Sequence, residues 1–293
     1  MVYATENEKI AQEFEINISP SFIKSTATVY KRQLLRLISN KTQLVFVILM
    51  PLMWLGIIGT SMTNLVPSST LNGQDFLTFM APGIFIMVTL FSGIFGGISL
   101  FYDRDSGYLK NYLIAPSPRI AIVVGYALGT STRVIIQVSL LMAFSVFLNA
   151  NLNLTLPNII IIYVFAILTT NFLMGLSITL ASKAPNVEVF QSIIMPVVMP
   201  LQFLAPILYP ASDIPAALRW IALINPITFG VDGIRGAIQS VNLTTPILTG
   251  TAFGIDFSFL RTNIVIFDML FLFIAGTIFL FMGARLFLKS LAG

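Results

Sequence analysis

The side chains best suited to chemistry in this sequence are its few charged ones, and they are unevenly placed. Only 10% of the residues are charged, yet five charges fall in the stretch FYDRDSGYLKNYLIAPSPR, residues 101–119, between two long apolar runs. They are Asp103, Arg104, Asp105, Lys110 and Arg119. A short charged loop of this kind suggests docking of a partner, and a plain charged connector is the alternative.

The same stretch carries turn and helix signals. Asp105-Ser106-Gly107 favours a turn or a helix start, and APSP at residues 115–118 stops any helix, because proline lacks an amide donor and restricts its predecessor. Between them, GYLKNYLIA can form about two turns of helix. Its apolar side chains then cluster: Tyr108, Leu109, Tyr112 and Leu113.

Residue types exclude several other kinds of chemistry. The chain has no Cys and no His, which excludes disulfides, thiol chemistry, His-based catalysis and most zinc or haem sites. A P-loop needs Gly-Lys followed by Ser or Thr, and no lysine here follows a glycine. The chain is therefore not a conventional P-loop ATPase, and any drive from ATP must come from another polypeptide.

Four further ionisable residues lie in apolar surroundings. Asp232 and Arg235 stand three residues apart, so they share a helix face and could pair. Arg133 and Asp268 fall inside apolar runs, where charged groups are costly and usually face a cavity or each other. Their expected depths differ, which argues against a direct pair, and Asp268 lies near enough to a helix end to reach the interface.

Composition places these residues in a membrane. The chain of 293 residues is 56% hydrophobic, with a net charge of +4, a pI near 9.4 and a mean hydropathy of +0.90. Soluble domains are about a quarter charged, so a water-soluble fold of this size would need far more charge on its surface. The sequence therefore predicts a polytopic membrane protein.

Six apolar stretches are long enough to cross a bilayer as helices, which takes about 20 residues. We expect the spans at Leu44–Thr63, Phe76–Phe101, Ile120–Leu148, Asn158–Ala181, Val187–Leu208 and Asn263–Leu288. Lipid offers backbone groups no partner, and the runs are too long and unbroken for barrel strands. The predicted fold class is an all-α polytopic membrane protein with six transmembrane helices.

Lysine and arginine positions set the orientation of the spans. Basic residues are frequent before the first span and between the second and third, whereas the loops 64–75 and 149–157 contain none. The pattern predicts a multi-pass protein of the plasma membrane, with both termini and the 101–119 loop in the cytoplasm. The outer side keeps only Arg219, Arg235 and Arg261, all in one long segment.

Residues 1–42 are expected to form a cytoplasmic N-terminus, ahead of a membrane domain at 43–293. Apolar residues recur in it at helical spacing, flanked by basic ones: Ile23, Ala27, Tyr30, Leu34 and Leu37. This predicts an amphipathic helix at about residues 20–40 that lies along the inner surface of the lipid bilayer. A polar helix packed on a partner is the alternative.

Two segments resemble a known family. YDRDSGYLKNYLIAPSPRIAIVVGYALG, residues 102–129, is similar to the cytoplasmic loop and third span of ABC type-2 export permeases. LAPILYPASDIPAALRWIALINPITFGVDGIRGAI, residues 204–238, is similar to the outer segment of that family. With six spans and the amphipathic start, the resemblance covers nearly the whole chain and makes residues 43–293 an ABC type-2 transmembrane domain. The drug- and lipid-exporting subgroup, with a daunorubicin-type exporter permease as its best-known member, is the most similar.

The resemblance implies partners and a coupling site. Such permeases pair as dimers and bind two copies of an ATPase, so the implied partners are an ABC ATPase subunit and a second permease copy. A homodimer is expected first, with a heterodimer as the alternative. The segment Asp103–Arg119 would be a coupling helix on the ATPase, with these contact candidates: Asp103, Arg104, Asp105, Gly107, Tyr108, Leu109, Lys110 and Tyr112. ATP and magnesium would bind to the ATPase, no cofactor would bind to this chain, and no nucleic acid is expected.

Residues 209–260 are too apolar for an ordinary loop and too short for two more spans. IPAALRWIALI (214–224) predicts one short helix and ITFGVDGIRGAIQ (227–239) a second, which together suggest a re-entrant hairpin. The resemblance supports this hairpin as an outer gate, and a surface loop is the alternative. Its candidate residues are Asp213, Pro215, Arg219, Trp220, Asn225, Pro226, Asp232 and Arg235.

By the same resemblance, the second and fifth spans would meet at the translocation path. The candidate path residues are Phe79, Phe85, Phe91, Phe95, Met195, Met199, Gln202 and Phe203, although such stripes are more often core or lipid-facing. Gly93 with Gly97, and Gly125 with Gly129, form small-xxx-small patterns that predict close helix packing.

The function that these features favour is the permease subunit of an ATP-driven exporter for a hydrophobic or amphipathic substrate, namely a drug, a lipid or a lipid-linked glycan. A stand-alone secondary transporter or channel is the alternative, and it would need a deep proton or ion site. An intramembrane enzyme is the weakest hypothesis, because the chain has no His, no Cys and no metal cluster.

Overall fold

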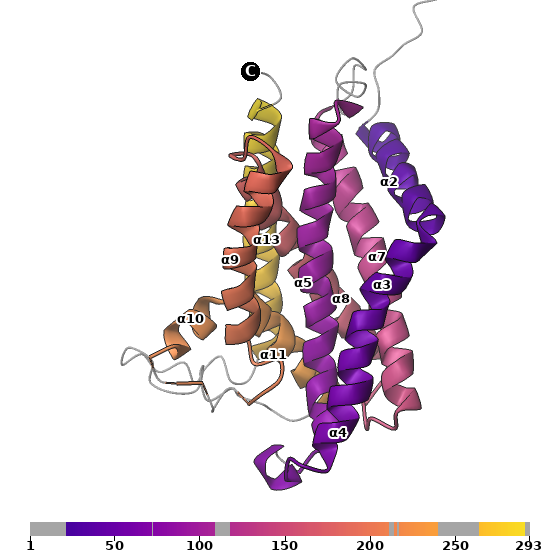
Figure 1. Cartoon of the computed structure of the whole chain (residues 1–293), viewed down its shortest axis with the longest axis vertical. Helices are drawn as coiled ribbons and strands as arrows, with labels where there is room; N and C mark the ends of the chain where they lie inside the picture. The colour runs from indigo at the N-terminus through magenta and orange to yellow at the C-terminus, as the bar shows by residue number, and fades with distance from the viewer. Residues whose placement is uncertain are drawn as a thin grey trace, which may run out of the picture.

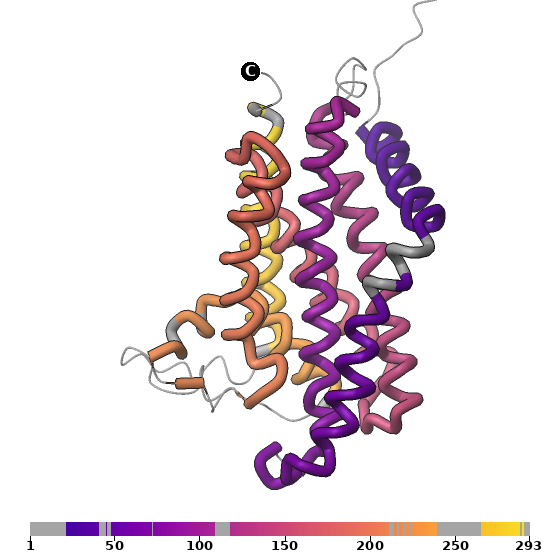
Figure 2. The backbone as a smooth tube through the Cα atoms, in the orientation of Figure 1, coloured from indigo at the N-terminus to yellow at the C-terminus, as the bar shows by residue number. Residues whose placement is uncertain are grey.

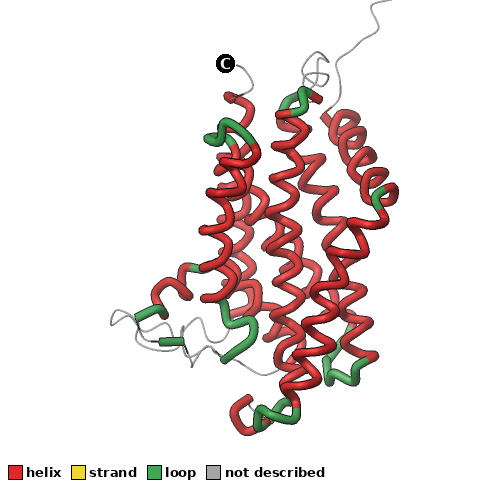
Figure 3. Tube along the Cα trace, in the orientation of Figure 1, coloured by secondary structure: helices red, strands yellow, loops and turns green. Residues whose placement is uncertain are grey.

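Most of the helices predicted from the sequence are present in the part of the chain that the structure describes, and the short helix predicted after Gly107 lies outside it. A computed structural model describes residues 22–71, 73–108, 118–210, 214–215, 217–239 and 264–290, and within these ranges it has helices and loops but no strand (Figure 3). The elements are α2 (Phe22–Ser39), α3 (Lys41–Met53), η1 (Trp54–Gly59), α4 (Thr60–Thr63), η2 (Ser68–Leu71), α5 (Phe76–Asp105), α7 (Ile120–Phe147), α8 (Leu156–Ala181), α9 (Val187–Leu204), α10 (Arg219–Ile224), α11 (Pro226–Gln239) and α13 (Ile264–Ser290).

Five helices of the described ranges are long and apolar enough to cross a bilayer: α5, α7, α8, α9 and Val265–Phe287 within α13. The first predicted span, Leu44–Thr63, is also helical, but it is divided into α3, the π-helix η1 and α4. Its apolar part, Ile48–Thr63, is shorter than the other five. Pro51 lies inside α3, where it removes an amide donor shortly before the π-helical turn. The six-span count therefore stays a prediction for this segment.

The helix α5 is the centre of the bundle. Nearly all of its side chains from Phe76 to Phe101 are buried, whereas α9 and α13 expose most of the residues of their apolar segments.

Two glycines let α8 approach α5 closely. A Cβ atom on Gly93 would lie 2.6 Å from the carbonyl oxygen of Thr170, and one on Gly97 would overlap the side chain of Ser177. The close packing predicted for these glycines is confirmed.

The helix predicted at about residues 20–40 exists as α2, and apart from Leu37 the residues that it buries lie outside the predicted apolar stripe. Thr26, Val29, Gln33 and Leu37 are buried, whereas Ile23, in the stripe expected from the sequence, is 74% exposed. The reason lies on α7, where Gly125 and Gly129 leave a trough. A Cβ atom on Gly125 would lie 2.6 Å from Cβ of Val29, and one on Gly129 would lie 2.5 Å from Cβ of Gln33.

The bundle has two different ends. The helices α5 and α13 terminate at the end where α7 begins, and α2 lies beside α7 there (Figure 1); we call it the Asp103 end. At the opposite end lie α4 and α11, and we call it the α11 end. In the view of Figure 2, as in Figure 1, α10 and α11 both lie toward the α11 end of the bundle.

Candidate functional site

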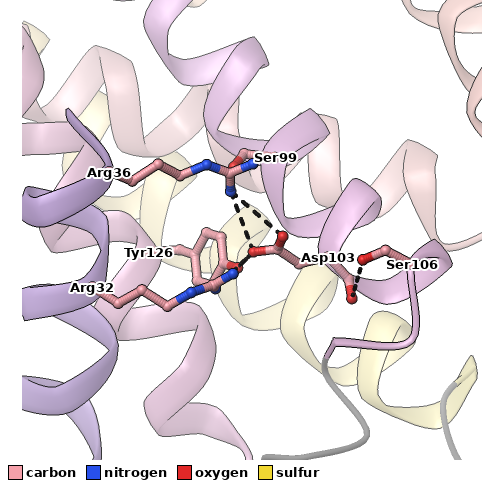
Figure 4. A network of polar contacts seen from close by, with 6 residues as sticks. All are labelled: Arg32, Arg36, Ser99, Asp103, Ser106 and Tyr126. Atoms are coloured by element: carbon pink, nitrogen blue, oxygen red, sulfur yellow. Dashed lines mark hydrogen bonds and ion pairs between the residues drawn. The ribbon is translucent and has the colours of Figure 1, made fainter. Parts of the chain in front are cut away.

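The charged stretch begins at a carboxylate that joins three helices (Figure 4). Asp103, near the end of α5, accepts a hydrogen bond from Nη1 of Arg32 on α2 at 2.8 Å. Arg36, one turn further along α2, places its Nη1 at 3.4 Å from the same carboxylate and at 3.2 Å from Oγ of Ser99. The hydroxyl of Tyr126 on α7 donates to Asp103 as well. We call these residues the Asp103 junction.

Charge stabilises this junction. The Asp103 side chain is 7% exposed, so its carboxylate depends on these donors, and hydrogen bonds to ionised partners are stronger than neutral ones. Burial alone would lower the pKa of Arg32, but hydrogen bonds and charge interactions with Asp103 and Tyr126 outweigh it and raise that pKa above its usual value. The sequence analysis missed Arg32, Arg36 and Tyr126, although the four-residue spacing of the two arginines places them on one helix face.

The residues after Asp103 divide into packed and exposed ones. Arg104 donates to the carbonyl oxygen of Ala184 at 3.1 Å and lies over the ring of Phe101, 4.3 Å from its centroid. It therefore connects α5 to the α8–α9 loop. Asp105 and Tyr108 are exposed. The other contact candidates, Leu109, Lys110 and Tyr112, lie outside the described residues.

The turn predicted at residues 105–107 ends α5. Gly107 has φ 74°, a left-handed conformation that favours glycine, and its amide donates to the carbonyl oxygen of Arg104 at 3.0 Å. The chain then returns toward α2, where the guanidinium of Arg32 lies 3.7 Å from the ring centroid of Tyr108. The start of the exposed loop is thus attached to the Asp103 junction.

At the α11 end, the expected hairpin consists of α10 and α11. The first helix is shorter than predicted, because it begins at Arg219, with Trp220 next, rather than near Ile214. Pro215 is exposed, and Asp213 lies outside the described residues. The predicted break is confirmed at Asn225 and Pro226, where α10 ends and α11 begins.

Asn225 fixes this hairpin to α9. Its Nδ2 donates to the carbonyl oxygen of Leu201 at 2.6 Å, and its Oδ1 accepts from the amide of Ile227 at 3.0 Å. The helix α11 that follows lies against α5, α8, α9 and α13, and its residues from Pro226 to Val231 are all buried. The second arm of the hairpin is therefore inside the bundle rather than on its surface.

Three ionisable residues gather at this end. Arg235 on α11 is 3% exposed and donates to the carbonyl oxygen of Pro206 at 2.9 Å; it also lies 4.1 Å from the ring centroid of Phe79. Asp232, one turn earlier, interacts with it electrostatically. Asp268 on α13 was expected to reach the membrane–water interface, but it is 0% exposed. It interacts electrostatically with Asp232. The expectation fails because α11 packs against α13 and covers this position.

Arg133 lies elsewhere, in the half of α7 toward the Asp103 end. Its side chain is half-buried. The positive charge of Arg36, which belongs to the Asp103 junction, acts on it electrostatically. Arg133 is at the middle of α7, whereas Asp268 is near the start of α13, and no ion pair joins these two described residues.

A cavity of about 460 Å³ brings together part of the predicted path. It lies between α3 with η1, α5 and α9, and its lining includes Phe91, Phe95, Met199, Gln202 and Phe203 from the predicted set. Of the others, Phe85 is in the core, Phe79 packs under Arg235, and Met195 is exposed on α9. The sequence analysis missed the contribution of the divided first helix: Met50, Pro51 and Trp54.

The lining of this cavity defines what could enter it. Within the described ranges, Gln202 and Trp54 are the lining residues whose side chains carry a polar group, and no charged side chain lines the cavity. Its volume falls within the range of about 300–1,000 Å³ that is common for small-molecule sites. We call it the Trp54 cavity. It can take an apolar molecule with few polar groups.

Comparison with known proteins agrees with these features. Residues 24–239, from α2 to the end of α11, match the family described as ABC-2 type transporter. The transport permease ycf38 of Cyanophora paradoxa is 29% identical over 216 residues, which cover 73% of this chain and 74% of that protein. The inner membrane transport permease YadH of Escherichia coli (strain K12) is 26% identical over 201 residues, 66% of this chain and 74% of that protein. This chain belongs to the ABC-2 type transporter family and is a multi-pass transmembrane transport subunit.

Proposed function

We propose that the chain is the permease subunit of an ATP-driven exporter that moves a hydrophobic or amphipathic substrate out of the cell. In this proposal it works in the plasma membrane as a dimer, with both termini in the cytoplasm and with an ABC ATPase bound at the Asp103 end. The family membership supports the ATPase partner. The similarity to the daunorubicin-type subgroup stays a prediction, as does the choice among drug, lipid and lipid-linked glycan.

The observation that carries the proposal is the Asp103 junction. It joins α2, α5 and α7 at the point from which the exposed residues Asp105 and Tyr108 leave the bundle. A force applied to those two residues would therefore act on three helices together, of which α5 is the central one. From α5 the movement would reach the Trp54 cavity, to which Phe91 and Phe95 belong, and the α11 hairpin, whose Arg235 packs on Phe79.

Association with the ATPase subunit tests the docking step. Asp105→Lys combined with Tyr108→Ala alters the two exposed side chains, of which Tyr108 also contacts Arg32. With an unchanged thermal midpoint, we expect the variant to lower the amount of ATPase that copurifies with the permease about ten-fold, a loss typical of disturbed interface hot spots. Lys183→Glu, an exposed charge on the α8–α9 loop of the same end, is the matched control and should retain the ATPase. Equal recovery with both variants contradicts the docking site, and an ATPase that never associates contradicts the function.

One observation favours the alternative of a stand-alone transporter. Asp232 and Asp268 are both buried and interact electrostatically, and buried carboxyls in a membrane are common in proton-coupled transport. Reconstituted vesicles separate the two functions. We expect efflux that needs the partner ATPase and ATP; efflux driven by a pH gradient without the ATPase, and lost in Asp268→Asn, would favour the alternative.

A further inference from the structure

A second groove lies on helices that take no part in the Trp54 cavity. Its volume is about 660 Å³, and its walls come from α2, α7, α8 and α13, whereas the Trp54 cavity is formed by α3 with η1, α5 and α9. The residues that matter most to its chemistry are Tyr30, Leu128, Thr132, Asn171, Thr277 and Phe281. We call it the α7 groove.

The groove is long and mostly apolar. It follows α7 from Ile120 to Ile135, and at 1.5 Å per residue these 15 steps amount to roughly 22 Å. Isoleucine, valine, leucine and alanine form most of its walls. Among the described residues, no acidic or basic side chain lines it. An extended apolar chain fits such a groove better than a compact polar molecule does.

A group of polar side chains crosses the groove partway along it. The hydroxyls of Tyr30 and Thr132 lie 3.0 Å apart, and Oγ of Ser131 donates to Oδ1 of Asn171 at 3.4 Å. Within the part of the chain that the structure describes, Nδ2 of Asn171 donates to no acceptor. An amide donor that faces lipid without an acceptor is costly, so the groove offers a position for an acceptor oxygen.

The groove opens at the Asp103 end of the bundle. Ile120, the first residue of α7, lines it, and Lys24 and Lys31 of α2 are exposed. A headgroup at this end leaves the rest of the groove to an acyl chain.

Basic residues stand at the Asp103 end of the groove. Arg119 is exposed next to Ile120, and Arg285 is exposed next to Ala284; both Ile120 and Ala284 are lining residues. The guanidinium of Arg285 lies 4.2 Å from the ring centroid of Phe281, another lining residue. Lys289 follows one turn later on α13 and is also exposed. Basic pockets between transmembrane helices on the cytoplasmic side bind anionic headgroups.

We propose that the α7 groove binds an anionic phospholipid of the inner leaflet. One acyl chain lies along the apolar wall that α7 contributes, and the phosphate lies between Arg119 and Arg285. This site is separate from the proposed path for the transported substrate, and it does not depend on the direction of transport or on the ATPase.

Native mass spectrometry of the purified full-length chain, with equimolar phosphatidylglycerol and phosphatidylcholine added, tests the proposal. The wild type should retain phosphatidylglycerol about five-fold better than phosphatidylcholine, the size expected from a basic residue near an anionic headgroup. Leu128→Trp fills the groove from an exposed position and should remove most of that adduct. Leu140→Trp is the matched control, because Leu128 and Leu140 are 47% and 46% exposed on the same helix, and only Leu128 lines the groove.

A second pair of variants tests the headgroup. Arg285→Gln should abolish the preference for phosphatidylglycerol, whereas Lys183→Gln, an exposed lysine away from the groove, should keep it. Equal thermal midpoints of the two tryptophan variants show that both are folded. The proposal is overturned if Leu128→Trp retains as much phosphatidylglycerol as Leu140→Trp, if the wild type binds both lipids equally, or if Leu128→Trp abolishes a dimer instead of a lipid adduct.

Discussion

At the scale of single residues, one carboxylate organises the Asp103 end. Asp103 accepts hydrogen bonds from side chains that are 71 and 67 residues earlier and 23 residues later in the chain. Its buried carboxylate depends on these partners, because a buried polar group without a partner is costly. The charge of Asp103 is therefore needed within the bundle. Among the described residues of this stretch, Asp105 and Tyr108 are exposed, whereas Asp103 and Arg104 pack against other helices.

A double-mutant cycle measures this interaction. Arg32→Gln and Asp103→Asn should each lower the free energy of unfolding by about 2 kcal/mol, since each leaves a partner of a buried hydrogen bond unsatisfied. Together they should cost clearly less than the sum, because both remove the same contact. Thermal unfolding in detergent gives the values, and Lys31→Gln, exposed on the same helix, should change nothing. Additive losses would show that the two side chains are not coupled.

At the scale of elements, the position of α2 depends on the trough that two glycines leave on α7. Val29 and Gln33 of α2 pack directly on Gly125 and Gly129 of α7. With this face of α2 against α7, Arg32 and Arg36 reach Asp103 on α5. The apolar stripe with Ile23 is then left outward, where an interfacial helix would contact lipid. The packing of α2 and the Asp103 junction are therefore consequences of the same two small residues.

The Gly129→Ala variant tests this dependence. Its methyl group would lie 2.5 Å from Cβ of Gln33, so α2 must move, and overpacking of this kind costs about 2 kcal/mol. We expect a lower thermal midpoint together with loss of ATP-driven transport, because the shift draws Arg32 away from Asp103. Gly56→Ala is the control, since its new methyl group would meet nothing closer than the ring of Phe144 at 3.5 Å. If Gly129→Ala and Gly56→Ala behave alike, α2 is not held by close packing.

The sequence predicted the elements better than their contacts, for a physical reason. Apolar length determines α5, α7, α8, α9 and α13, and local signals such as Asn225-Pro226 and Asp105-Ser106-Gly107 end helices wherever they occur. Which face of α2 is buried, and whether Asp268 is covered, depends on residues far along the chain. The division of the first span also lies beyond apolar periodicity, because a π-helical turn changes the hydrogen-bond register without changing composition.

At the scale of the whole molecule, the two ends differ in the charges that they present. Exposed basic residues gather at the Asp103 end, on α2, on the α8–α9 loop and on the last turns of α13. Two connections at the other end, residues 64–75 and 149–157, contain no Lys or Arg, and the long segment between α9 and α13 contains Arg219, Arg235 and Arg261. Because basic loops stay in the cytoplasm during insertion, this asymmetry predicts one orientation for the bundle, and both the ATPase site and the lipid site depend on it.

Single-cysteine labelling tests that orientation directly. The natural chain has no cysteine, so an introduced one is its only thiol. Ser69→Cys lies in η2 at the end opposite Asp103, and Lys183→Cys lies between α8 and α9; both positions are exposed. A membrane-impermeant maleimide should label Ser69→Cys in intact cells and Lys183→Cys only after permeabilisation, because the positive-inside rule keeps the Lys183 loop in the cytoplasm. The reverse pattern would place the Asp103 junction on the outer face, where no cytoplasmic ATPase could reach it.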